Sequence, residues 1–205
     1  MIAAASAGVS AHRYDELLQA TRIAVASDRV RVEMSLTPGI EVANAVLGTI
    51  DRDGNGVLSR DEQVAYARRV LSRVSLRVDG GTPLPLQLTT VESPDERAIR
   101  GGDGAIAIQS EAVLPPLSAG RHRLFFRNGH DPDGSVYLAN ALVPEDAAVA
   151  VTGQLRDGSQ SELTIEFALT SNPWLSSRQI WMAVAALMLV PSRRLFRAQS
   201  TTPRS

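Results

Sequence analysis

Hydrophobic and polar residues alternate along residues 21–36, TRIAVASDRVRVEMSL, on both sides of Ser27 and Asp28. The apolar positions of the two runs fall on one face; they are Ile23, Val25, Val30, Val32, Met34 and Leu36. A period of two, with β-branched residues, is typical of half-buried strands. The pattern predicts a β-hairpin that turns at Ser27 and Asp28.

The period changes to that of a helix after the strand-breaking residues 37–39, TPG. Within residues 40–50 the apolar positions at helical spacing are Ile40, Ala43, Val46, Leu47 and Ile50. Within residues 62–74 they are Val64, Ala67, Leu71 and Val74. We therefore expect two amphipathic helices, joined by the polar segment DRDGNGVLSRDE.

Beyond Ser75 the period returns to two. Seven short segments have the pattern of strands, at residues 76–78, 84–91, 105–113, 122–127, 135–143, 149–155 and 162–169. Segments rich in Gly, Pro and Asp separate them. Many short strands at near-regular spacing predict an antiparallel β sandwich or barrel, and we expect the sandwich. The expected fold is therefore mainly β, with a domain at residues 12–170 and a helix–loop–helix insertion at residues 40–74.

Composition narrows the possible functions. The 205 residues are 44% hydrophobic and 21% charged, which is typical of a globular protein with a buried core. A formal net charge of −1 gives no basic character for nucleic acid, so we expect no nucleic-acid partner. The absence of Cys excludes disulfides and thiolate chemistry. No nucleophile elbow or phosphate loop occurs, and we expect no enzyme activity.

The segment at residues 51–62 carries oxygen-bearing side chains at alternate positions. Asp51, Asp53 and Asn55 are followed by Gly56, and Glu62 ends the segment. This spacing between two expected helices resembles the EF-hand over about 35 residues, 40–74. The resemblance implies that the loop binds Ca²⁺.

Each residue type in the loop has a physical reason, because Ca²⁺ takes six to eight oxygen ligands. Six residues would supply them: Asp51, Asp53 and Asn55 through side chains, Val57 through its carbonyl, Ser59 directly or through water, and Glu62 through both carboxylate oxygens. Gly56 permits the sharp turn that a Cβ would obstruct. The other interpretation is an acidic turn in which Asp61 and Glu62 stabilise the start of a helix.

The loop has no second copy in the sequence, so it either acts singly or pairs with a loop of another chain. A second candidate begins with Asp131 and Asp133, but Val136 replaces the required Gly and Leu142 replaces the closing carboxylate. A lone loop with three carboxylates predicts weak binding, on the order of 10⁻⁴ to 10⁻³ M, as in extracellular modules. We therefore expect a mainly structural ion rather than a fast cytosolic switch.

The two ends of the chain have the composition of export and anchoring segments. Residues 1–11, MIAAASAGVSA, are small and apolar and end like a cleavage site; we interpret them as the remnant of a signal peptide, the alternative being a disordered terminus. Residues 174–190 combine two Trp with an apolar run and precede an Arg-rich tail. We expect residues 171–205 to form a short hydrophobic membrane-anchor helix and a basic tail, the alternative being a helix docked on the core. The domain would then lie outside the cytoplasm, in the periplasm or at the cell surface, anchored to the inner membrane.

The three histidines offer a second kind of metal chemistry. Cleavage after Ala11 would place His12 at the N-terminus, where its amine and imidazole would bind Cu²⁺ or Ni²⁺ together. His130 lies in a turn beside Asp131 and is a further candidate ligand, whereas His122 alternates with apolar residues and is expected on a strand face. The alternative function is therefore a periplasmic nickel or copper accessory, or a transport-associated domain.

A broader resemblance covers residues 11 to about 170. The segments AHRYDELLQATRIAVASDRVRVEMSLTPGIEVA and HRLFFRNGHDPDGSVYLANALVPED are similar to the extracytoplasmic N-terminal region of bacterial membrane proteins of the HupE/UreJ type. That family is thought to move nickel or related metals. Its multi-span membrane part is absent from this sequence, so the resemblance implies a periplasmic relative and not transport itself.

Overall fold

The computed structural model describes residues 15–131 and 133–170. The predicted leader at residues 1–11, His12 and the predicted anchor at residues 171–205 lie outside the described residues. Within the described part of the chain, no helix has the length and apolar character that a membrane span requires.

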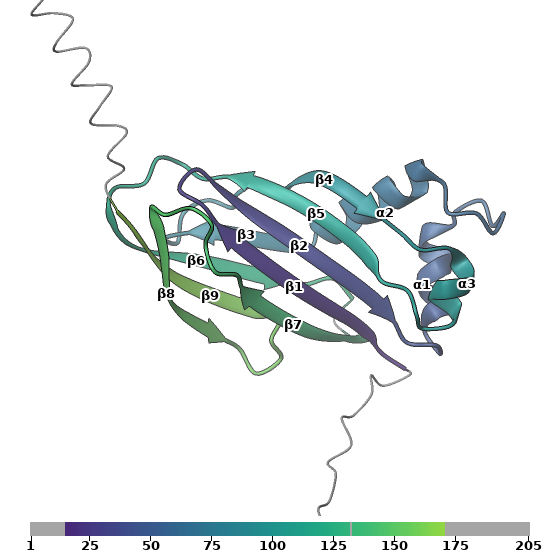
Figure 1. Ribbon diagram of the computed structural model, residues 1–205. Coiled ribbons are helices and arrows are strands. Elements are labelled where there is room, and N and C mark those ends of the chain that lie inside the picture. Colours follow the sequence, from purple (N-terminus) through teal and green to yellow (C-terminus); the bar gives the residue numbers. More distant parts are fainter. Residues whose placement is uncertain (1–14, 132, 171–205) are drawn as a thin grey trace, which may run out of the picture. The chain divides into compact units, whose positions relative to one another are not determined.

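The described residues are mainly β and form two sheets (Figure 1). The first sheet has the strand order β4-β5-β2-β1-β7 and the second has the order β3-β6-β9-β8. The strands of the first sheet are β1 (Leu17–Val25), β2 (Arg29–Pro38), β4 (Gln87–Glu92), β5 (Ile106–Val113) and β7 (Ser135–Ala141). Those of the second are β3 (Val74–Val78), β6 (Gly120–Asn128), β8 (Val149–Arg156) and β9 (Glu162–Leu169).

The predicted hairpin forms, with β1 antiparallel to β2 and Val25 opposite Val30. Its turn lies at residues 26–28, as the sequence pattern predicts. Every apolar residue assigned to the inner face of this hairpin is buried. A single core cluster joins the inner faces of the strands, and Phe126 of β6 and Phe167 of β9 are its largest fully buried side chains.

The prediction of an antiparallel sandwich is wrong at one strand pair. β7 runs parallel to β1, with Leu17 opposite Ser135 and Ile23 opposite Ala141. The chain leaves the first sheet after β5, forms β6 in the second sheet, and returns beside the start of β1, where the Leu17 amide donates to the Gly134 carbonyl at 2.8 Å. The returning strand therefore points along β1. Every other strand pair in the described residues is antiparallel.

Side chains from the opposite sheet cover part of the β7 edge. The amide of Ala141 donates to Oε1 of Gln154 at 2.9 Å, and Nε of Arg156 donates to the Ala139 carbonyl at 2.7 Å. Both Gln154 and Arg156 belong to β8. Backbone groups that an edge strand would otherwise leave open are thus paired across the two sheets, which blunts the edge against pairing with another chain.

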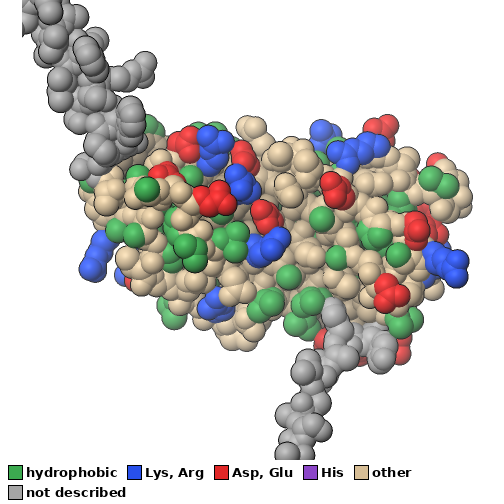
Figure 2. Space-filling model, in the orientation of Figure 1, with side chains coloured by type: hydrophobic (Ala, Val, Ile, Leu, Met, Phe, Trp, Pro, Cys, Tyr) green, Lys and Arg blue, Asp and Glu red, His purple; other side chains and the backbone are tan. Residues whose placement is uncertain are grey.

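The outer face of the first sheet carries charged side chains among apolar ones (Figure 2). Arg22 and Glu33 lie 2.9 Å apart on adjacent strands, and Arg31 lies 3.5 Å from Glu111. Exposed pairs of this kind contribute little to stability. They keep this face polar while the opposite face of the same strands forms the core.

Three helices gather at one end of the sheets (Figure 1): α1 (Ala43–Ile50), α2 (Arg60–Leu71) and α3 (Glu96–Arg100). The first two correspond to the predicted helices, and Ala43, Val46, Leu47 and Ile50 are buried as expected. Ile40 was expected on the same face, but it precedes the helix and is 47% exposed. In α2 the buried stripe is Tyr66, Ala67, Val70 and Leu71, so the prediction missed Tyr66 and Val70. It was wrong for Val74, which belongs to β3 because α2 ends at Leu71, and the predicted Val64 is half-buried.

The apolar pattern predicts no helix at the residues of α3. Asp95 caps α3, and its side chain accepts from the Ala98 amide at 2.8 Å. Five residues are too few for a helical period to show in the sequence. The cap itself, an Asp followed by a Glu in the first turn, was the available signal.

Candidate metal centre

The predicted metal-binding loop, residues 51–62, joins α1 to α2. The helix α1 ends at Ile50, and the amide of its C-cap residue, Asp51, donates to the Leu47 carbonyl at 2.8 Å. The helix α2 begins after Ser59, which forms a capping box with Glu62: the Ser59 side chain accepts from the Glu62 amide, and the Glu62 side chain accepts from the Ser59 amide. Both ends of the loop are therefore fixed by helix termini.

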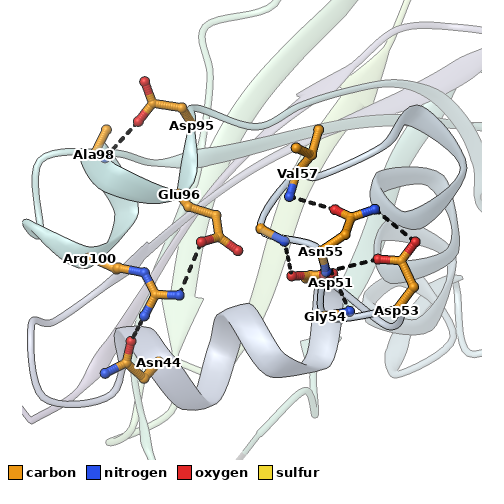
Figure 3. Close-up of polar contacts among 11 residues, drawn as sticks. Asn44, Asp51, Asp53, Gly54, Asn55, Val57, Asp95, Glu96, Ala98 and Arg100 are labelled. Atoms are coloured by element: carbon orange, nitrogen blue, oxygen red, sulfur yellow. Dashed lines mark hydrogen bonds and ion pairs between the residues drawn. The ribbon is translucent and has the colours of Figure 1, made fainter.

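The Asp51 carboxylate organises the first half of the loop (Figure 3). Its Oδ1 accepts from the amides of Gly54 at 2.8 Å and Asn55 at 3.2 Å, and its Oδ2 accepts from the Gly56 amide at 3.0 Å. Gly56 has φ of 78°, a left-handed conformation that lets its amide turn inward and that strains residues with a Cβ. The backbone thus curls around the Asp51 side chain.

Asp53 and Asn55 form the middle of the loop. Asp53 accepts from the Asn55 amide at 3.1 Å through Oδ1 and from Nδ2 of Asn55 at 2.8 Å through Oδ2. Oδ1 of Asn55 accepts from the Val57 amide at 2.7 Å. The Val57 side chain is 65% exposed, as suits a position whose expected contribution is its backbone carbonyl.

Glu62 reaches from the first turn of α2 back across the loop. Its Oε1 accepts from the Arg52 amide at 2.7 Å. Its Oε2 accepts from the amide of Ser59 at 3.0 Å and from the Ser59 hydroxyl at 2.7 Å. One carboxylate therefore links the start of the loop to its end, besides capping the helix.

Three of the six predicted ligand residues come together as a cluster of carboxylates. Asp51, Asp53 and Glu62 each offer an oxygen, and these oxygens lie within 4.8 Å of one another. The other three, Asn55, Val57 and Ser59, lie in the same loop. Within the described ranges, this is the one group of three or more acidic or His side chains close enough to share an ion.

Hydrogen bonds hold the carboxylates in their charged form. The Gly56 amide, followed by further bonds within the loop, lowers the pKa of Asp51. The Ser59 hydroxyl, followed by the Arg52 and Ser59 amides, lowers the pKa of Glu62. Hydrogen bonding to an ionised carboxylate favours that form. Both groups are therefore anionic at neutral pH, as ligands for a hard cation must be.

The unpredicted helix α3 stands beside the loop and is hydrogen-bonded to α1 (Figure 3). Arg100 donates to Glu96 at 3.0 Å and also contacts Oδ1 of Asn44 in α1. Oε2 of Glu96 lies 4.0 Å from the point where a Cβ on Gly56 would stand. On the other side, Arg60 of α2 donates to the Val91 carbonyl of β4. The loop is thus framed by elements that reach the sheet.

The two described histidines lie outside the carboxylate cluster. His122 is buried on the inner face of β6, as predicted; Nδ1 contacts Oδ2 of Asp79 at 2.7 Å and Nε2 contacts the Ser118 carbonyl at 2.8 Å. Both ring nitrogens are therefore engaged. His130 joins no cluster of three or more acidic or His side chains within the described residues.

Comparison of the chain with protein-family models, with curated proteins and with solved structures finds no match.

Proposed function

We propose that residues 51–62 bind one Ca²⁺ ion and that the ion is mainly structural. The observation that carries the proposal is the approach of the Asp51, Asp53 and Glu62 carboxylates to within 4.8 Å of one another. Three like charges at this separation repel, and a divalent cation among them reverses the sign of the interaction. A bound ion would therefore offset the repulsion among the carboxylates that the loop holds together.

The donor set selects Ca²⁺ among the common metals. Every ligand in the proposed set is an oxygen, from Asp51, Asp53, Asn55, Val57, Ser59 and Glu62. With Glu62 bound through both oxygens, seven ligand atoms fall inside the range of about six to eight that Ca²⁺ takes. Mg²⁺ requires a near-ideal octahedron and retains waters, and softer metals prefer nitrogen or sulfur. A flexible, carboxylate-rich loop therefore favours Ca²⁺.

Weak affinity follows from the number of charges and from the lack of a paired loop. A dissociation constant on the order of 10⁻⁴ to 10⁻³ M is typical of extracellular modules and fits a three-carboxylate loop. Such a site fills where Ca²⁺ is plentiful, which supports placing the protein in the periplasm or at the cell surface, exported and tethered to the membrane. The ion would fix α1 against α2, and both helices pack on the sheets.

Isothermal titration calorimetry of the full chain with CaCl₂ tests the proposal. We expect one site in the wild-type protein and none in Asp51→Ala or Glu62→Gln. The second variant is the sharper one, because Gln fills the third helical position of a capping box as well as Glu does. Glu62→Gln therefore keeps the helix cap and removes a ligand charge.

The matched control is Asp61→Asn, which removes the same charge from the neighbouring residue. Asp61 is exposed and lies outside the carboxylate cluster. If the loop is a metal site, this variant binds Ca²⁺ nearly as the wild type does. Equal binding by Glu62→Gln and the wild type would refute the proposal and leave the loop as an acidic helix cap.

A further inference from the structure

A cavity of about 640 Å³ lies between α1, α2 and the β6–β7 connection. Its size falls within the range of small-molecule sites, about 300 to 1,000 Å³. Both apolar side chains and side chains able to form hydrogen bonds line the cavity. The lining includes Leu17, Val42, Val46, Tyr66, Arg73 and His130. The cavity is separate from the carboxylate cluster of the loop, none of whose residues line it.

The Tyr66 hydroxyl is available to a ligand. The residue is only 2% exposed, and its hydroxyl makes no hydrogen bond with the described part of the chain. No fully buried side-chain nitrogen or oxygen in the described residues lacks a partner, so this hydroxyl retains contact with the cavity it lines. Burial raises the pKa of Tyr66, and the group therefore stays protonated and can donate.

The imidazole of His130 stands edge-on to Tyr66, with ring centroids 6.0 Å apart and planes at 82°. The backbone carbonyl of His130 accepts from Nε2 of Gln19 at 2.9 Å and from the Tyr137 hydroxyl at 2.7 Å. These two hydrogen bonds hold the residue in place. The ring nitrogens have no partner among the described residues. Burial lowers the pKa of His130, so the ring is neutral at pH 7 and offers one donor.

Positive charge predominates at the cavity. Nη2 of Arg69 donates to the Thr49 carbonyl at 2.7 Å, and its guanidinium lies 5.7 Å from the centre of the Tyr66 ring. The Arg73 guanidinium has no partner within the described residues. Asp131 is the acidic residue of the lining. Two arginines against one carboxylate leave one positive charge for a ligand to neutralise.

We propose that this cavity binds a small organic monocarboxylate with an apolar body. Its carboxylate would accept from the Tyr66 hydroxyl and pair with Arg73, and its hydrocarbon part would rest on Leu17, Val42 and Val46. Hydrogen-bond donors in one cavity lining, together with one surplus positive charge, suit a single anion. The apolar side of the cavity favours an organic acid over inorganic phosphate, and the surplus charge disfavours an amine.

Calorimetric titration of the full chain with hexanoate tests this site, with hexanamide as the neutral probe of the same size. The titrations are done in EDTA, so that their outcome is independent of the Ca²⁺ proposal. We expect saturable hexanoate binding at about millimolar or tighter, as eight non-hydrogen atoms permit. Hexanamide should bind at least tenfold more weakly, because a hydrogen bond to a charged group is the stronger one.

Two variants locate the binding. Tyr66→Phe removes only the hydroxyl and should weaken hexanoate binding about tenfold. Arg73 is exposed, so Arg73→Gln should fold normally and weaken binding severalfold. The matched control is Arg68→Gln, on the same helix but outside the cavity lining, which should leave binding unchanged. Absence of saturable binding, equal binding of the two probes, or equal loss in the Arg73 and Arg68 variants would each overturn the proposal.

Discussion

A buried pair of amides holds the two sheets and the β6–β7 connection together, and its removal gives the most quantitative prediction. Gln19 of β1 is 1% exposed and Asn128 of β6 is 3% exposed. Nδ2 of Asn128 donates to Oε1 of Gln19 at 2.9 Å, and Oδ1 of Asn128 accepts from the His130 amide at 3.0 Å. Nε2 of Gln19 also donates to Oγ of Ser135 at 2.7 Å.

The substitution Asn128→Ala leaves two groups without a partner, the Oε1 of Gln19 and the amide of His130. A buried polar group that loses its partner costs about 1 to 3 kcal/mol, so the free energy of unfolding should fall by about 2 to 6 kcal/mol. A water molecule that fills the space of the lost amide would bring the loss to the lower end. Against a typical total of about 5 to 15 kcal/mol, this is a large effect.

Urea unfolding followed by circular dichroism measures the loss as a lower midpoint at constant slope. Gln19→Ala and the double variant complete a cycle, whose coupling energy should be about 1 to 3 kcal/mol because the side chains bond directly. The control Gln109→Ala, at an exposed position of β5, should change stability by less than about 0.5 kcal/mol. A loss below about 1 kcal/mol for Asn128→Ala, or additive single effects, would refute this reasoning.

Two further predictions concern the loop and the pairing of His122 with the half-exposed Asp79. Gly56→Ala forces a Cβ into a left-handed conformation and should weaken Ca²⁺ binding about tenfold by calorimetry, whereas Gly48→Ala, in open space on α1, should not weaken it. Hydrogen bonds to Asp79 and to the Ser118 carbonyl raise the pKa of His122. Burial acts to raise the pKa of Asp79, but hydrogen bonds from His122 and from the Arg123 amide outweigh it, so the pKa of Asp79 is lowered. The contribution of His122 to stability is therefore present below about pH 6.5 and is lost as the pH rises through its folded-state pKa. The contribution of Asp79 is present above about pH 3.9 and is lost as the pH falls through its folded-state pKa. In His122→Phe the decline of the urea midpoint above about pH 6.5 should be smaller than in the wild type; an unchanged decline would contradict the assignment.

Local pattern was sufficient for much of the fold. The hairpin, most strands and both long helices follow from periods of two and 3.6, which neighbouring residues set among themselves. The prediction from apolar spacing fails at Ile40. Its side chain continues the apolar pattern of α1, yet the helix begins at Ala43, and Ile40 lies against Gly102, in the turn that follows α3. The first turn of a helix depends on its surroundings more than on the apolar spacing.

In the candidate site, too, some features follow from the sequence and others depend on the tertiary structure. The sequence alone determined which oxygen-bearing residues share the loop at residues 51–62, because twelve consecutive residues cannot spread far apart and Gly56 allows them to curl. Tertiary structure decided that α3 stands beside this loop. It also decided the parallel pairing of β7 with β1, the amide pair of Gln19 and Asn128, and the Tyr66–His130 cavity. These contacts join residues far apart in sequence, 109 positions for the amide pair, and depend on how the sheets close around a shared core, which no local period records.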